Sequence, residues 1–179
     1  VDSLLIQPDS DGSAPTTGTL SSASDNVGIG KDVFSALTSG TRNVAIGKDA
    51  LKVNTTGQKN VVIGYAAMDA NTTGDLNVAI GHYALSANTT ADNNTAINNN
   101  ALKNNTTGTA NVAVGESALA ANTTATGNTA VGRQASYSNT TGASNTSLGN
   151  AALYTATTGD ENTALGRQAL YSATTADNN

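Results

Sequence analysis

A seventeen-residue repeat dominates this chain. The segment Asn43–Lys59, NVAIGKDALKVNTTGQK, returns along the sequence with neither insertion nor deletion. The nine complete copies begin at Asn26, Asn43, Asn60, Asn77, Asn94, Asn111, Asn128, Asn145 and Asn162, and Asn179 opens a tenth. A fixed period of this length predicts a solenoid in which each repeat forms one coil.

Charge separates the seventeen positions of the repeat into two groups. All eight Lys and Arg residues lie at positions six, ten and seventeen, and the acids of the array add only positions seven and sixteen. Positions one to five, eight, nine and eleven to fifteen carry no charge in any copy. Because an unpaired buried charge is costly, the uncharged positions are predicted to be buried or tightly stacked.

Apolar residues two apart in the repeat indicate a short strand. Positions two and four are mostly β-branched, as in Val44 and Ile46, so we expect both to line the coil interior with Leu51 at position nine. Ala45 at position three would then face outward. Since this position is small and mostly apolar in every copy, we expect it to pack against a sister chain.

A helical repeat is excluded by local composition. Gly occupies position five in eight copies, with Asn98 as the exception, and β-branched residues surround the strand segment. The predicted fold is therefore all-β, a parallel β-roll or β-helix solenoid of nine coils with Gly30 and its equivalents at one corner. Successive coils should stack about 4.8 Å apart.

Two segments follow from the repeat boundaries. Residues 1–25 are predicted to form an N-terminal strand, Leu4–Ile6, followed by a connector rich in Ser, Thr, Gly and Pro. Residues 26–179 form the repeat array. We expect the chain to be a piece of a longer polypeptide, with the array continuing beyond residue 179 or abutting another domain.

Composition narrows the possible functions. Only 3% of residues are aromatic and there is no Trp, so small side chains must fill the core. The net charge of −5 argues against nucleic acid as a partner, and the absence of Cys excludes disulfides. The sequence shows neither an apolar run long enough for a membrane span nor a signal peptide, so we expect no membrane insertion.

The repeat resembles two families of fibrous proteins. NVAIG followed by AL and NTTG resembles the head repeats of trimeric autotransporter adhesins and, more closely, the arrays of bacteriophage tail fibres. The second likeness rests on DNVGIG at Asp25–Gly30 and NTAVGRQASYSNTTG at Asn128–Gly142. It covers about 154 of 179 residues and implies a left-handed parallel β-roll assembled as a homotrimer.

The resemblance implies a structural and adhesive function. The expected protein is a shaft or adhesin segment of a phage tail fibre, extracellular on the virion, that contacts a glycan or protein receptor on the host surface. One alternative is the head of a bacterial trimeric surface adhesin. Another alternative is an ice-binding solenoid, because the Thr pairs, such as Thr55-Thr56, place hydroxyl groups regularly along the axis. It is less favoured because only one Thr of each pair would be displayed. We expect no enzymatic activity, no cofactor and no metal site.

Several motifs allow a functional reading beside a structural one. The NTT triplets at Asn54, Asn71, Asn88, Asn105, Asn122 and Asn139 match the N-glycosylation motif, but repeated asparagines at a coil corner favour amide ladders. His82, the only histidine, has neither a second His nor a carboxylate cluster near it in the repeat, so a metal or general-base role is not expected.

Three tyrosines are the candidate contact residues. Tyr137, Tyr154 and Tyr171 occupy position ten in three successive repeats, where other copies carry Lys52 and Asp69. An exposed tyrosine stripe is therefore predicted. Its rings would either stack on a bound sugar or stack on one another to cover one edge of the rod.

Overall fold

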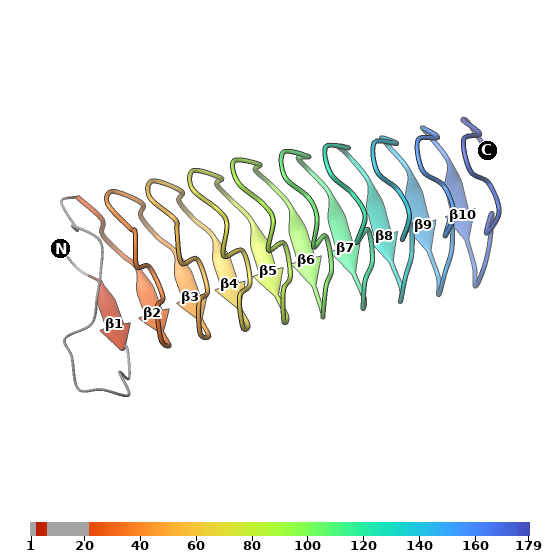
Figure 1. Ribbon diagram of the computed structural model, residues 1–179. Coiled ribbons are helices and arrows are strands. Elements are labelled where there is room, and N and C mark those ends of the chain that lie inside the picture. Colours follow the sequence, from red (N-terminus) through yellow and green to blue (C-terminus); the bar gives the residue numbers. More distant parts are fainter. Residues whose placement is uncertain (1–2, 7–21) are drawn as a thin grey trace.

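The computed structural model describes residues 3–6 and 22–179 (Figure 1), and the predicted connector lies mostly outside these residues. Ten strands of three residues each follow one another along the rod. They are β1 (Leu4–Ile6), β2 (Val27–Ile29), β3 (Val44–Ile46), β4 (Val61–Ile63), β5 (Val78–Ile80), β6 (Thr95–Ile97), β7 (Val112–Val114), β8 (Thr129–Val131), β9 (Thr146–Leu148) and β10 (Thr163–Leu165).

All ten strands belong to one parallel sheet in sequential order. From β2 onward each residue pairs with the residue seventeen positions later, as Ala45 does with Val62. The described residues form no helix, and no part of them is a helix long and apolar enough to cross a membrane. The prediction of an all-β parallel solenoid is confirmed, with about eight coils. The count of nine coils, the left-handed sense and the trimer stay predictions.

Tight corners explain why each strand is so short. Gly47 follows β3 with a φ of 131°, and a Cβ on it would lie 2.4 Å from the carbonyl oxygen of Gly64 in the next coil. Only Gly accommodates that approach without strain. Asn98, with a φ of 99°, is the exception. After this corner Asp49, Leu51 and Lys59 adopt φ values of 61°, 47° and 57°, so every coil turns through left-handed residues.

The predicted orientation of the strands is wrong. Position three points into the coil: Ala45, Val62 and Ala79 are 0% exposed within a single chain. The reason is the thinness of the coil. At Gly28, a Cβ would lie 2.5 Å from Cδ1 of Leu5, its partner on the adjacent strand, and 2.9 Å from Phe34 Cδ2, so the interior has room only for small side chains at most copies of this position.

The large β-branched residues at positions two and four therefore point outward. Val61 and Ile63 on β4 are each 37% exposed, whereas Val62 between them is buried. Position three with positions eight and nine, such as Ala50 and Leu51, makes the core. The absence of charge therefore did not distinguish side chains that point into the coil from side chains that point outward.

Two ladders of buried asparagines run along the solenoid. At position one, Asn43 donates from its Nδ2 to Asn26 Oδ1 at 3.0 Å and to the Gly57 carbonyl at 2.9 Å. At position twelve, Asn71 Nδ2 donates to Asn54 Oδ1 at 2.8 Å. These amides are 0 to 2% exposed, and the predicted amide ladders are confirmed.

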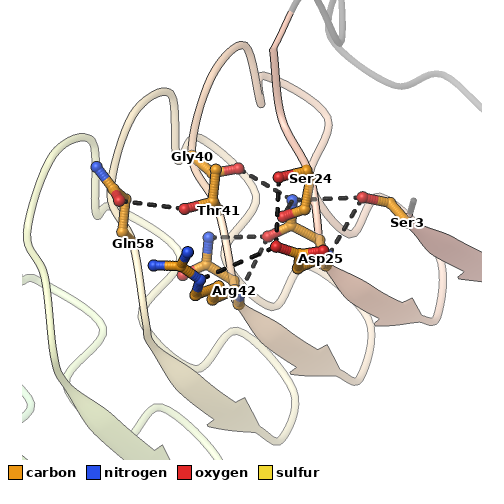
Figure 2. A network of polar contacts seen from close by, with 9 residues as sticks. Ser3, Ser24, Asp25, Gly40, Thr41, Arg42 and Gln58 are labelled. Carbon is orange, nitrogen blue, oxygen red and sulfur yellow. Dashed lines mark hydrogen bonds and ion pairs between the residues drawn. The ribbon is translucent and has the colours of Figure 1, made fainter. Parts of the chain in front are cut away.

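Ser3 ends the first ladder at the N-terminal side. It stands where a preceding coil would place its asparagine, and its Oγ accepts from the backbone N–H of Asn26 at 3.2 Å. Figure 2 shows this contact beside the Arg42–Asp25 pair, at 3.9 Å, and the bond from Thr41 Oγ1 to Gln58 Oε1. Ser3, directly before β1, thus caps this asparagine ladder, a feature the sequence did not reveal.

One polar pair interrupts the apolar core. Ser136 replaces the usual Leu at position nine, and Ser147 replaces the usual Ala at position three of the next repeat. Ser136 Oγ donates to Ser147 Oγ at 2.8 Å, and both side chains are buried. The apolar core before this pair is one cluster, ending at Ala135, and a second cluster begins at Ala152.

Candidate interaction surfaces

The outer strand face consists of positions two and four of every repeat. It is apolar or carries Thr along its whole length, and no member is charged. Exposure rises at its C-terminal end, where Leu148 is 46% and Leu165 72% exposed. Its members are Val27, Ile29, Val44, Ile46, Val61, Ile63, Val78, Ile80, Thr95, Ile97, Val112, Val114, Thr129, Val131, Thr146, Leu148, Thr163 and Leu165.

The outer strand face is a continuous surface and not a set of isolated exposed apolar residues. Because successive coils stack in register, the side chains of β2–β10 form two continuous files along the rod. Extended apolar patches of this kind mark interaction sites in soluble proteins. If the strand face is covered by another chain, as the sequence predicts, the residues available for that contact are Val44 and Ile46 and their equivalents, and not Ala45.

The three predicted contact tyrosines form a stack. The ring centroids of Tyr137 and Tyr154 are 5.2 Å apart with an interplanar angle of 7°, and those of Tyr154 and Tyr171 are 5.1 Å apart at 3°. The rings therefore face one another along the axis. This geometry favours covering of the rod edge over stacking on a sugar, because the face of Tyr154 on each side is occupied by a neighbouring ring.

A second aromatic cluster lies nearer the N-terminus and was missed from the sequence. Tyr65 and His82 occupy position six of successive repeats, with centroids 5.2 Å apart, and Tyr83 follows at position seven. Tyr83 lies edge-on to Tyr65 at 85° and 4.2 Å from the His82 ring. The sequence could have indicated this cluster, because aromatic residues replace the small, polar or charged residues that other repeats carry at positions six and seven.

Two lysines flank this cluster. Lys48 Nζ lies 5.4 Å from the Tyr65 ring centroid, and Lys103 Nζ lies 5.3 Å from that of Tyr83. Lys48 also pairs with Asp49 at 3.5 Å, whose other oxygen accepts from Lys52 at 2.9 Å. Burial acts to raise the pKa of Asp49, but these two lysines outweigh it and lower that pKa. The proximity of Tyr65 raises the pKa of the Tyr83 phenol.

The glycosylation motifs serve the fold. The six NTT asparagines are 0 or 1% exposed, and their Nδ2 groups donate within the ladder and to carbonyls such as that of Gly74. A glycan cannot be attached to a buried amide that is already hydrogen-bonded. The paired threonines divide as expected: Thr55 Oγ1 donates to the Thr72 carbonyl at 3.0 Å, whereas Thr56 is exposed.

Acids at position sixteen also have a structural role that the sequence did not disclose. Asp75 Oδ1 accepts from the backbone N–H of Gln58 at 2.7 Å, and Asp92 Oδ1 accepts from that of Asp75 at 2.7 Å. Each carboxylate thus joins two coils. In the part of the chain that the structure describes, no group of three or more His, Cys, Asp or Glu residues is placed to hold a metal ion.

A scan against protein-family models, a search of curated proteins and a search of solved structures found no significant match. The resemblance to tail-fibre repeats therefore rests on the residues of the repeat alone.

Proposed function

We propose that this chain is a structural segment of a trimeric fibre, most closely a bacteriophage tail fibre, that takes part in attachment to a host cell. The observation that supports the proposal is the outer strand face. It presents two uninterrupted files of apolar and Thr side chains along the rod, without a charge in any repeat.

Self-association is the simplest cover for this face. Its files follow the axis of the solenoid with the same coil spacing in every copy of the chain, so identical rods match one another along their full length. Three chains packed face to face around a common axis would bury Val61, Ile63 and their equivalents. The left-handed sense implied by the resemblance and the nine coils counted from the sequence repeats belong to this proposal.

The rod is mechanically suited to a shaft. Successive coils are joined by strand pairing and, over most of the rod, by two asparagine ladders and Thr side-chain bonds, so bending must disturb several bonds at once. A fibre of three identical chains also repeats each surface feature three times. Weak contacts with a repeated glycan or protein on a host surface would then act together.

The mass of the purified full chain in solution tests the proposal. Sedimentation equilibrium should give three times the 17.8 kDa of one chain. A folded chain that sediments as a monomer at micromolar concentration would refute the trimer and, with it, the fibre.

A bacterial trimeric surface adhesin remains the runner-up. The same outer strand face would serve the head of such an adhesin. The two are separated by the neighbouring genes and by the remainder of the coding sequence: tail structural genes favour the phage fibre, whereas a membrane anchor in the same polypeptide favours the adhesin.

A further inference from the structure

The aromatic-lysine patch comprises Tyr65, His82 and Tyr83 with Lys48 and Lys103 at its two ends. Tyr65 is 41% exposed, His82 is exposed and Tyr83 is half-buried. The patch residues occupy positions six, seven and ten of the repeat, none of which is a member of the outer strand face. Its rings therefore belong neither to the core nor to the surface proposed for assembly.

The aromatic side chain of Tyr83 is not one that the fold requires. Position seven has a positive φ in every repeat, 55° at Tyr83 and 61° at Asp49, so the fold itself sets this backbone conformation. The other repeats place small or polar residues such as Asn100 at this position. The backbone turn therefore forms without a tyrosine ring.

The ring geometry also differs from that of the tyrosine stack. Tyr137, Tyr154 and Tyr171 lie almost parallel, one per coil, as a simple repeat would produce. In the patch, Tyr83 stands at 85° to Tyr65, so the two rings form a corner and do not continue one column. A corner of this kind offers ring edges and two phenol hydroxyls to one ligand.

Charge selects the kind of ligand. Lys103 forms no ion pair within the described ranges 3–6 and 22–179, and its ammonium is held over the Tyr83 ring. Lys48 is partly neutralised by Asp49. The patch thus keeps a positive end at Lys103 on a chain of net charge −5, and screening restricts the repulsion of that net charge to about 8 Å at physiological salt.

We propose that the aromatic-lysine patch binds an oligosaccharide whose sugars carry carboxylates. The two lysines belong to repeats three coils apart, a span of roughly 14 Å at the usual strand spacing, which suits a short run of pyranose rings. The sugar C–H groups pack on the exposed ring edges, because His82 and the two lysines lie over ring faces of Tyr65 and Tyr83. A carboxylate accepts a charge-assisted hydrogen bond from Lys103 Nζ, and the phenols and the His82 ring bond to sugar hydroxyls.

This inference rests on the proposed function in one respect, that the rod meets an outer cell surface. Binding of a soluble sugar is nevertheless measured separately from assembly. A trimer that does not bind the sugar would contradict the binding site alone. A monomer that still binds the sugar would contradict the fibre alone.

The experiment titrates the full chain with tetragalacturonate and with its methyl ester, which keeps the rings and removes the charge. Ring signals of Tyr65, His82 and Tyr83 are followed by NMR. We expect saturable shifts with the acid and at least fivefold weaker binding of the ester. Tyr83→Asn, which introduces the residue already present at Asn100, and Lys103→Gln should each weaken binding about tenfold.

Tyr154→Ala is the matched control, because it removes an aromatic ring from the other stack at a position where Ala120 already occurs. Binding of tetragalacturonate to this variant should equal that of the unchanged chain. The proposal is overturned if the acid does not bind, if acid and ester bind equally, or if Tyr154→Ala weakens binding as much as Tyr83→Asn.

Discussion

At the scale of the residue, small size is the property that the core selects. Ala45 has no exposed surface because the facing wall of the coil is close, while its neighbours Val44 and Ile46 stand on the outer strand face. Sequence reasoning placed the larger hydrophobic residues inside, as the usual link between size and burial suggests. In a coil this thin, room for side chains decides the orientation before hydrophobicity does.

Substitution by leucine distinguishes the two orientations. Ala45→Leu adds three carbons to a filled interior and should lower the free energy of unfolding by about 1–3 kcal/mol. Val44→Leu keeps an apolar side chain on the outer strand face and should change that free energy by less than about 0.5 kcal/mol. Urea denaturation of both variants measures the difference, and a reversed order would restore the orientation predicted from the sequence.

Asn139 shows what the end of an amide ladder costs. The next repeat carries Ala156 at position twelve, so the buried Oδ1 of Asn139 has no hydrogen-bond partner among the described residues. A buried acceptor left without a donor costs about 1–3 kcal/mol. The sequence showed the missing asparagines at Ala156 and Ala173, but only the structure shows that an orphaned oxygen results.

Extension of that ladder should stabilise the chain. In the double variant Ala156→Asn with Ala173→Asn, Asn139 Oδ1 gains a donor and the ladder ends at residue 173, which is half-buried and within reach of water. We expect the free energy of unfolding to rise by about 1–3 kcal/mol. Ala156→Asn alone should give less, since it moves the orphaned oxygen by one coil. A double variant that melts earlier than the parent would contradict this account.

At the scale of the element, a coil is defined by its neighbours as much as by its own residues. The repeat length, the strand positions and the asparagine ladders followed from periodicity, because those features recur in every copy. The Ser136–Ser147 bond, the Ser3 cap and the aromatic-lysine patch did not follow. Each is a single departure, and a departure acquires meaning only when the structure shows which residue of the adjacent coil it meets.

The Ser136–Ser147 pair should behave as a coupled unit. Ser147→Ala alone leaves the buried hydroxyl of Ser136 without its acceptor and should destabilise the fold by about 1 kcal/mol. Ser136→Leu with Ser147→Ala restores the side chains of the other repeats and joins the two apolar clusters, so this double variant should be more stable than the parent. Additive effects in a double-mutant cycle would show that the two hydroxyls are independent.

At the scale of the whole molecule, the proposed assembly through the outer strand face can be tested with charged substitutions. Ile46→Glu with Ile63→Glu places two charges on it without touching the core and should yield a folded monomer. Thr56→Glu with Thr73→Glu adds the same charge at an exposed corner and should leave the trimer intact. Sedimentation measures the mass and circular dichroism the fold. Equal masses for the two double variants would exclude this face as the contact.

Length is a second property of the whole molecule. Removal of one complete repeat, residues 111–127, brings Asn128 onto Asn94 in the register that Asn111 held. We expect a shorter rod whose melting temperature changes by only a few degrees. Removal of residues 111–126 shifts all later residues by one position and should abolish cooperative unfolding of the C-terminal coils, because inward and outward side chains exchange places. Thermal melts of the two deletions provide the comparison.

The asparagine ladders therefore have a genetic consequence. Bonds from ladder asparagines to the side-chain oxygen seventeen residues earlier tie the chain to a unit of fixed size. We expect slippage or recombination between copies to be tolerated in multiples of seventeen codons, because any other change in length breaks the register of the ladder. We accordingly expect a solenoid of this type to be lengthened or shortened over generations in whole repeats, while the diameter of the rod and the direction of its surface side chains stay unchanged.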